Sequence, residues 1–311
     1  MILALDNVAE RDRHNSRRAP ATSDGEDGNM CASETLKTQL DRNTGVLRLT
    51  MNRPHRLNAA DRDLHLELSR IWHAIDADSD VRAVVVTGAE RAFSSGGDLD
   101  MLRRNMETGS GVLRTGREAL QIVEGMLSCE KPIVSAINGM AVGAGLAVAL
   151  TADISVAGET VHLSDGHSKL GVAAGDHAVM SWPLLCGMAK AKRYLLLGEP
   201  LDGAEAERIG LVSFAVPNDA VLSTATRIAE ELAGGNALAL RWTKRSLNYW
   251  YRLGGPMYEL SVFQEMLGFA LGEAKEGADA IKEKRPPAFG SGGDNLTEWE
   301  GPPVPYLPPL S

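Results

Sequence analysis

The sequence predicts an α/β fold with a helical C-terminal region. Two observations carry this prediction. Short apolar strand segments alternate with helical segments through residues 36–216. Only amphipathic helical segments follow, between residues 219 and 283. Alternation of strand and helix is typical of an α/β domain, and the helical ending indicates a separate layer or region packed against it.

The first elements are two strands, a helix and a third strand. Residues 36–51, LKTQLDRNTGVLRLTM, predict two strands joined at residues 43–45, where a glycine supplies the positive φ that a tight hairpin needs. A helix is expected from Asp61, its N-cap. Its apolar residues recur at spacings of three and four and share one face: Leu64, Leu68, Ile71, Trp72 and Ile75. Residues 81–88, VRAVVVTG, predict a buried strand.

Further segments continue this alternation after a loop-and-helix section. In chain order they predict a strand at 131–138, a helix at 143–150, a strand at 152–158, helices at 181–198 and 203–210, and a strand at 211–216. Four amphipathic helical segments then close the fold, from about Asp219 to Glu283. Their apolar content exceeds what one small core can cover, so we expect subunit packing there, with intramolecular capping of the core as the alternative.

Composition divides the chain into four parts. Residues 1–35 are predicted to be a disordered N-terminal extension, because their charge is mixed and their apolar content is low. Residues 36–245 form the core domain and residues 246–288 a helical oligomerisation region. Residues 289–311 form a tail rich in Gly and Pro.

Charge and cysteine content exclude several classes of function. The formal net charge of −9 argues against a nucleic-acid partner, which needs clustered cations. No apolar run approaches the ~18 residues of a membrane helix, so we expect no membrane partner. The three cysteines are too few and too scattered for a disulfide framework or a zinc site. They indicate a reducing compartment, hence a cytoplasmic location, and no bound metal.

Two glycine clusters are candidate ligand sites. In RAFSSGGDL, residues 91–99, the glycines let a ligand approach the backbone, and the N–H of Gly97 is placed to face a developing negative charge. In INGMAVGAGL, residues 137–146, a helix begins after a strand and offers unpaired N–H groups. A simple turn is the alternative for the first cluster. A dinucleotide fingerprint fails because Val148 stands at the third glycine position, and a hydrolase elbow fails at Leu170.

Several motifs in the same order resemble the enoyl-CoA hydratase/isomerase family, the crotonases. They are RLTMNRPHRLNAA, RAFSSGGDLDML, KPIVSAINGMAVGAGLAVALTADISVAG, LGVAAGD, GAEAERIGLVSFAVP and EKRPPAF, and they span about residues 36–288. The resemblance implies a spiral of ββα repeats with a C-terminal helical trimerisation region. It further implies a homotrimer or a hexamer built as a dimer of trimers, a coenzyme A thioester as substrate, and no tightly bound cofactor.

The resemblance also assigns backbone donors and coenzyme A contacts. The two N–H groups that bind the thioester oxygen as it becomes an enolate fall on Gly97 and Ala144. Arg53 and Arg56 are candidates for the coenzyme A phosphates, with a solvated loop as the alternative. Further contacts with coenzyme A are assigned to Ala92, Ser94 and Asp98. Lys244, Arg245 and Lys282 are weaker candidates of the same kind.

The chain departs from the family at the acid and base. The two glutamates of a family hydratase match Ala147 and His167 in this sequence. Adding water to a double bond needs one group to activate water and another to protonate carbon, and alanine does neither. His167 is suited to proton transfer near neutral pH, and Asp165 either orients it or only occupies the loop. The resemblance therefore supports the thioester site more strongly than the hydratase reaction.

Asp176 is the nearest candidate for the second acid–base group. It lies close to the nucleophilic aspartate of halobenzoyl-CoA dehalogenases in this family, one position out of register. The spacing from His167 to Asp176 also resembles the β-diketone hydrolases of the superfamily, which break carbon–carbon bonds. Those enzymes carry a histidine where this chain has Ala144. The structural alternative is that Asp176 caps its helix and His167 donates to a carbonyl.

Three functions are compatible with these residues. The first is an acyl-CoA lyase or isomerase of fatty or aromatic acid metabolism, in which His167 and Asp176 replace the glutamates. The second is a carbon–carbon hydrolase acting on a β-diketone. The third is a catalytically silent acyl-CoA-binding protein. The sequence does not identify the acyl group.

Overall fold

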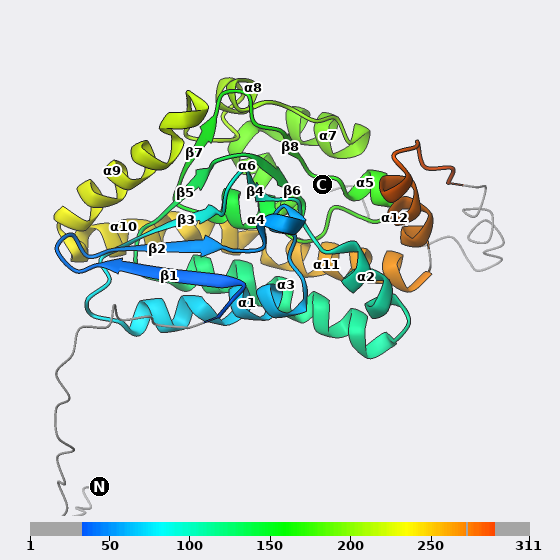
Figure 1. The fold of residues 1–311 in the computed structure, drawn as a ribbon, viewed down its shortest axis with the longest axis horizontal. Coiled ribbons are helices and arrows are strands. Elements are labelled where there is room, and N and C mark those ends of the chain that lie inside the picture. Colours follow the sequence, from blue (N-terminus) through cyan, green and yellow to red (C-terminus); the bar gives the residue numbers. More distant parts are fainter. Residues whose placement is uncertain (1–32, 272, 290–311) are drawn as a thin grey trace, which may run out of the picture.

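A six-stranded sheet organises the fold of residues 33–271 and 273–289, which the computed structural model describes (Figure 1). In spatial order its strands are β1 (Leu36–Asp41), β2 (Val46–Met51), β3 (Ala83–Gly88), β5 (Ile133–Ile137), β7 (Ile154–Gly158) and β9 (Phe214–Val216). β1 pairs antiparallel with β2, and the other pairs are parallel. The predicted hairpin and buried strands are confirmed.

A second, three-stranded sheet lies beside the first. Its parallel strands are β4 (Ala92–Ser94), β6 (Met140–Val142) and β8 (Leu163–Ser164). Each of these strands follows one strand of the large sheet along the chain, so β3–β4, β5–β6 and β7–β8 are three successive pairs shared between the sheets. A helical segment follows each pair, which confirms the predicted spiral of strand–strand–helix repeats. Strands of two or three residues are too short to show a period, so the sequence did not predict them.

The helices carry the following bounds. They are η1 (Pro54–Arg56), α1 (Arg62–Ala77), α2 (Leu99–Met106), α3 (Gly109–Ser128), α4 (Ala144–Thr151), α5 (His167–Leu170), α6 (Ala178–Cys186), α7 (Met188–Leu197), α8 (Gly203–Arg208), η2 (Asn218–Ala220), α9 (Val221–Gly234), α10 (Ala237–Leu253), α11 (Gly255–Leu271) and α12 (Glu273–Glu283). The helix predicted over 181–198 is two helices, α6 and α7, which meet at Gly187. None of the described helices is long and apolar enough to cross a membrane.

The large sheet is covered on both faces. Strand β3 is buried along its whole length, and its side chains alternate between two apolar clusters. Val84 and Val86 belong to the main core with α1 and α4, whereas Ala83 and Val85 pack with the alanines of α9 on the other side. This alternation follows from the period of two in a strand and explains why the segment is apolar without interruption.

The predicted domain boundaries need two corrections. The helical region does not begin at residue 246, because α10 runs unbroken from Ala237 to Leu253. The predicted N-terminal extension is ordered at its end, where the hydroxyls of Ser33 and Thr35 donate to Glu67 on α1. The rest of that extension and residues 290–311 of the predicted tail lie outside the described residues.

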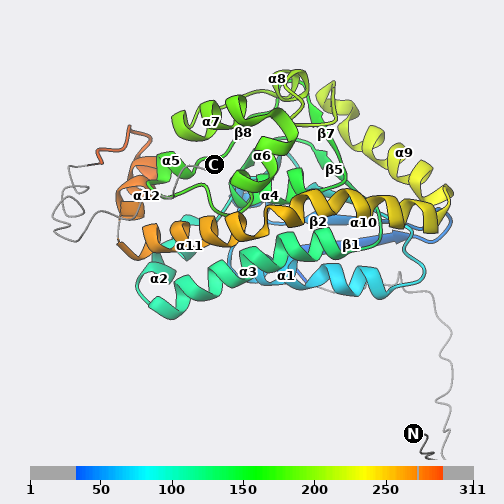
Figure 2. The same cartoon turned by 180° about the vertical axis from the view of Figure 1, so that it is seen from behind.

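Helices α10 and α11 expose many large apolar side chains. They lie end to end across the back of the molecule, along α3 (Figure 2). The exposed residues are Leu238, Trp242, Leu247, Tyr249, Trp250, Leu253, Met257, Leu260, Phe263, Leu267 and Leu271. Such a continuous apolar face is unusual for a surface that stays in water.

Asp61 is expected to stabilise the start of α1 in two ways. Its carboxylate accepts a hydrogen bond from the Leu64 N–H, and it lies 3.0 Å from Nε of Arg53. Asp61→Ala should lower the free energy of unfolding by about 1–2 kcal/mol, the usual cost of a lost N-cap. Urea denaturation measures this. Asp63→Ala, an exposed change in the same turn, is the control, and an equal loss in both variants would contradict the assignment.

Candidate active site

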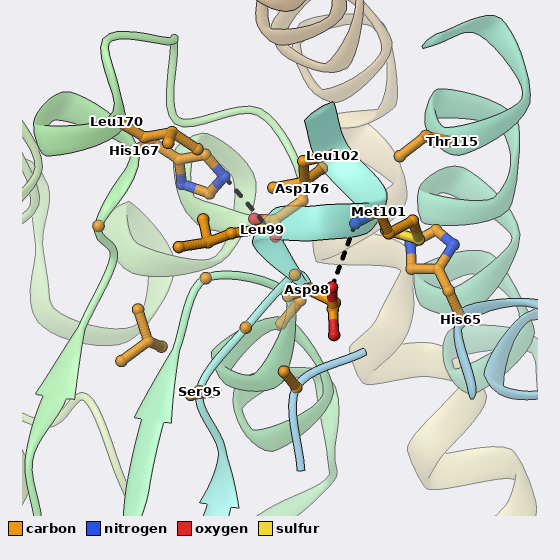
Figure 3. A pocket seen from close by; sticks show the side chains of 18 of the residues that line it. His65, Ser95, Asp98, Leu99, Met101, Leu102, Thr115, His167, Leu170 and Asp176 are labelled. Carbon is orange, nitrogen blue, oxygen red and sulfur yellow. Dashed lines mark hydrogen bonds and ion pairs between the residues drawn. The ribbon is translucent and has the colours of Figure 1, made fainter. Parts of the chain in front are cut away.

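A cavity of about 700 Å³ lies where the small sheet meets helices α2, α3 and α11. The loops after β4, β6 and β8 each contribute to its wall. Figure 3 shows side chains from several of these elements turned toward one space. Parallel strands end at a common edge, so the loops that follow them converge there, which is where ligands bind in sheets of this kind.

Two backbone N–H groups in this wall lack an acceptor. Gly97 lies in the turn before α2, and Ala144 is the first residue of α4; both line the cavity. Neither N–H donates to a protein group within the part of the chain that the structure describes. Unpaired backbone donors beside a cavity are suited to an oxygen that gains negative charge. The structure thus brings together the two donors predicted from the sequence.

Gly145 makes this arrangement possible. A Cβ atom at Gly145 would lie 2.6 Å from Cβ of Ser94 and 2.7 Å from the Ser94 carbonyl oxygen. Any other residue would push α4 away from the end of β4. The close packing allows Gly97 and Ala144 to line the same cavity.

His167 lies among three carboxylates and is almost fully buried. Its Nδ1 is 3.1 Å from Oδ1 of Asp165, an ion pair that lacks hydrogen-bond geometry. Its Nε2 is 3.5 Å from Oε1 of Glu265 and 3.8 Å from Oδ2 of Asp176 (Figure 3 shows the Asp176 pair). All four side chains line the cavity. His167 and Asp176, predicted as a pair, therefore do face one cavity.

Asp176 is hydrogen-bonded to a second histidine, His177. The indole N–H of Trp182 donates to Nε2 of His177 at 3.3 Å, so the proton of the neutral ring must be on Nδ1. Nδ1 of His177 then donates to Oδ1 of Asp176 at 2.6 Å. Asp176 is not the N-cap of α6, because that position is His177 and no side chain caps the helix. The capping alternative is therefore wrong.

The same hydrogen bonds argue against a metal ion. Asp165, Asp176 and His177 each place one possible ligand atom within 4.8 Å of the others. Both ring nitrogens of His177 are already engaged, so the imidazole offers no lone pair unless a hydrogen bond breaks. The absence of a bound metal remains a prediction.

The cluster separates the pKa values of its members. Burial alone would lower the pKa of His167, but the three carboxylates raise it well above 6.5. Burial would raise the pKa of Asp176, yet the imidazoles of His167 and His177 hold it at about 2. Burial raises the pKa of Glu265, against the opposing effect of His167. The imidazole is thus a proton donor and Asp176 an ionised acceptor, a division typical of acid–base sites.

Arg53 and Asp98 form a largely buried ion pair. Nη1 of Arg53 lies 3.2 Å from Oδ2 of Asp98 and donates to the Ala59 carbonyl, while its Nε contacts Asp61. Burial would raise the pKa of Asp98, but the hydrogen bond from the Met101 N–H and the Arg53 charge hold it below its usual value. Nε and Nη1 of Arg53 are thus engaged by protein groups, and Arg53 does not line the cavity, which does not support its predicted contact with coenzyme A. Asp98 does line the cavity, as the N-cap of α2.

The other predicted cofactor contacts divide between the interior and the cavity mouth. Ala92 and Ser94 are each 1% exposed and do not line the cavity. Ser94 donates to the Asn58 carbonyl and accepts from the Gly96 N–H, so it shapes the loop instead of contacting a ligand. Arg56 and Lys282 do line the cavity, whereas Lys244 and Arg245 do not. Arg56 is exposed, and its only ion pair, among the described residues, is a 3.5 Å contact with Asp100.

The sequence did not point to Glu265 or His65 as site residues. Glu265 lies on the buried face of α11 with Val262 and Phe269, and His65 lies on the buried face of α1 with Leu68 and Trp72. A charged or polar residue on the apolar face of a helix is a signal that could have identified them, because such residues are rarely buried without a partner. The pattern of one helix does not identify the partner of such a residue.

Comparison with known proteins gives a consistent result. A family model described as enoyl-CoA hydratase/isomerase matches residues 41–292. The chain is 32% identical over 244 residues to "Probable enoyl-CoA hydratase, mitochondrial" of Dictyostelium discoideum, a match that covers 78% of this chain and 86% of the relative.

Solved structures share the fold. An enoyl-CoA hydratase/isomerase from Mycobacterium paratuberculosis is similar with a TM-score of 0.76 at 31% identity, over 79% of this chain and 98% of that one. A β-diketone hydrolase from the cyanobacterium Anabaena is similar with a TM-score of 0.70 at 26% identity, over 76% and 94%.

The raised pKa of His167 predicts a pH-dependent stability. The folded pKa exceeds the unfolded one, so the stabilising contribution of the imidazolium is complete below about 6.5 and is lost as the pH rises through the folded value. The difference in free energy of unfolding between wild type and His167→Gln should be largest near about pH 6 and shrink toward about pH 9. Urea denaturation across this range measures it.

The exposed His73 of α1 provides a matched control. His73→Gln should not change the pH profile. A constant difference between wild type and His167→Gln at every pH would contradict the ion-pair arrangement.

Proposed function

The chain belongs to the enoyl-CoA hydratase/isomerase family, and from this premise we propose that it binds an acyl-CoA thioester and stabilises the derived enolate. The thioester oxygen accepts hydrogen bonds from the N–H groups of Gly97 and Ala144. The single observation that carries the proposal is that both donors line the cavity without a protein acceptor within the described residues. Two such donors contribute a few kcal/mol each to an oxyanion in a dry site.

His167 and Asp176 take the acid and base roles in this proposal. Ala147 lines the cavity but has no group that transfers a proton, so the work passes to the cluster around His167. Asp176 is ionised and lines the cavity, and it accepts a proton from water. The His167 imidazolium donates a proton to the α-carbon of the enolate. For an enoyl thioester, the water oxygen adds to the β-carbon and the reaction is a hydration. The proton on Asp176 then passes to Nε2 of His167, 3.8 Å away, which restores both groups.

The buried charges argue against a silent binding protein. Oδ1 of Asp165 and Oε2 of Glu265 lack a hydrogen-bond partner among the described residues. Three carboxylates around one imidazole cost stability, since buried charges need compensation. A protein that only binds acyl-CoA gains nothing from this cost, whereas an acid–base site does.

A carbon–carbon hydrolase is the second candidate. The observation that favours it is the similarity to the β-diketone hydrolase from Anabaena. The same groups serve this reaction. Asp176 activates water for attack on one carbonyl, and the carbon–carbon bond beside that carbonyl breaks. The two N–H donors bind the oxygen of the enolate that leaves, and His167 protonates its carbon. The two candidates differ in the bond that breaks and in the need for coenzyme A.

The substrates separate the candidates. Hydration of crotonyl-CoA, or exchange of the α-hydrogens of butyryl-CoA with D₂O followed by NMR, supports the acyl-CoA enzyme. Cleavage of a cyclic β-diketone without coenzyme A supports the hydrolase. Tight binding of butyryl-CoA with neither reaction would leave the silent binding protein as the function.

We expect His167→Ala and Asp176→Asn each to reduce turnover by ~100-fold or more, because both act in proton transfer. The double variant should lose little further activity, since groups that act as a unit are non-additive. Steady-state kinetics measure this, with melting temperatures to verify folding. His162→Ala is the control, because that imidazole does not line the cavity. Near-normal turnover by folded variants would refute the assigned roles.

We also propose a cytoplasmic location and a homotrimer or hexamer, in which neighbouring subunits cover the apolar face of α10 and α11. Trp250 of α10 and Phe263 of α11 are 64% and 62% exposed. Light scattering at micromolar concentration should give a trimer or hexamer, and Trp250→Glu with Phe263→Glu should give smaller species. A monomeric wild-type protein would contradict this proposal.

A further inference from the structure

One buried ion pair in the cavity wall has no role in the proposed proton transfers. Nδ1 of His65, in the first turn of α1, lies 2.8 Å from Oε2 of Glu118 on α3. The two side chains are 6% and 9% exposed. Helices α1 and α3 pack along each other, so the pair fixes the imidazole between two long helices.

The pair leaves one ring nitrogen open. An ionised carboxylate only accepts hydrogen bonds, so the proton of the imidazole is on Nδ1, facing Glu118. Nε2 of His65 has no partner within the described residues. His65 lines the cavity, and Figure 3 shows its ring beside Met101, across from His167. Nε2 is therefore the ring atom available to a ligand.

The wall residues beside His65 on α1, α2 and α3 are otherwise non-reactive, although His65 is near enough to Asp176 to contribute to the lowered pKa of that carboxyl. Besides His65, helices α1 and α3 contribute Thr115, Ala119 and Ile122 to the cavity wall. The Thr115 hydroxyl already donates to the Gly111 carbonyl and accepts from Asn105. Met101 and Leu102 of α2 continue the apolar lining. Nε2 of His65 is thus an open polar side-chain atom in an apolar part of the cavity.

We propose that His65, oriented by Glu118, hydrogen-bonds an oxygen on the acyl chain, so that the preferred thioester carries a hydroxyl or keto group beyond its β-carbon. This inference rests on the proposed function. The neutral ring accepts from a hydroxyl through Nε2, and the protonated ring donates to either oxygen. A hydrocarbon chain would cover Nε2 without replacing its hydrogen bond to water, which costs affinity.

A purely structural role predicts a different specificity. If the pair only joined α1 to α3, apolar residues of similar volume would serve as well, and the site would not distinguish oxygenated from plain acyl chains. The specificity of binding, which packing alone would not change, therefore separates the two roles.

The test compares three thioesters that share one chain length: pentanoyl-CoA, 4-hydroxypentanoyl-CoA and 4-oxopentanoyl-CoA. Their oxygen lies one carbon beyond the β-carbon to which water adds. Isothermal titration calorimetry on the full chain measures each Kd. The wild type should bind the better of the two oxygenated ligands about 10-fold or more tightly than pentanoyl-CoA, as expected for a site that hydrogen-bonds a substrate oxygen.

Two variants locate the effect on Nε2. In His65→Asn the amide nitrogen takes the place of Nδ1 and can still donate to Glu118, but nothing replaces Nε2. In His65→Gln the amide nitrogen takes the place of Nε2. The preference should fall to about threefold or less in His65→Asn and be better retained in His65→Gln. Thr115→Val, in the same part of the cavity, should keep the wild-type preference.

The outcomes separate this inference from the proposed function. Failure of all three thioesters to bind overturns both. Binding of pentanoyl-CoA without a preference for an oxygenated ligand in the wild type overturns this inference alone. So does a full preference in folded His65→Asn. If His65→Asn does not fold, the other two variants decide. A preference for the oxygenated ligand that is lost in Thr115→Val but kept in His65→Gln also overturns the inference.

Discussion

The ion cluster around His167 is the interaction on which the candidate site depends. Asp165 precedes the histidine by two residues, whereas Glu265 comes from a helix near the end of the chain. Without the imidazolium, three buried carboxylates would face one another, and removing one partner of a buried ion pair typically costs about 3–5 kcal/mol. The positions of α5, α11 and the loop before α6 are thus electrostatically linked.

Tight backbone packing accompanies this electrostatic link. A Cβ atom at Gly175 would lie 2.4 Å from Oε2 of Glu265 and 2.6 Å from the Ser261 carbonyl oxygen. The loop that carries Asp176 therefore lies directly on α11, with Trp182 and His177 holding the carboxylate from behind. An acid–base site benefits from such rigidity, because groups held in place need no reorganisation when charge moves.

The ion cluster contains no oxyanion donors, and the strands of the small sheet position them. Each strand of the small sheet ends at the cavity, and the turns after β4 and β6 present the N–H groups of Gly97 and Ala144. The Arg53–Asp98 pair holds the first of these turns against the start of α1. Oxyanion donors on backbone and proton-transfer groups on side chains thus come from different structural layers, and the substrate binds between them.

The sequence by itself determined the local elements and the parts of the site that local motifs encode. Apolar periodicity identified the buried strands and α1 with its cap at Asp61, and the glycine motifs together with the family resemblance indicated Gly97 and Ala144. The spacing from His167 to Asp176 indicated a shared cavity. Only the tertiary structure decided how distant charges pair: Glu265 with His167, His65 with Glu118, and Arg53 with Asp98. The physical reason is that periodicity records which face of an element is buried, whereas the partner of a buried charge depends on which distant face the fold brings against it.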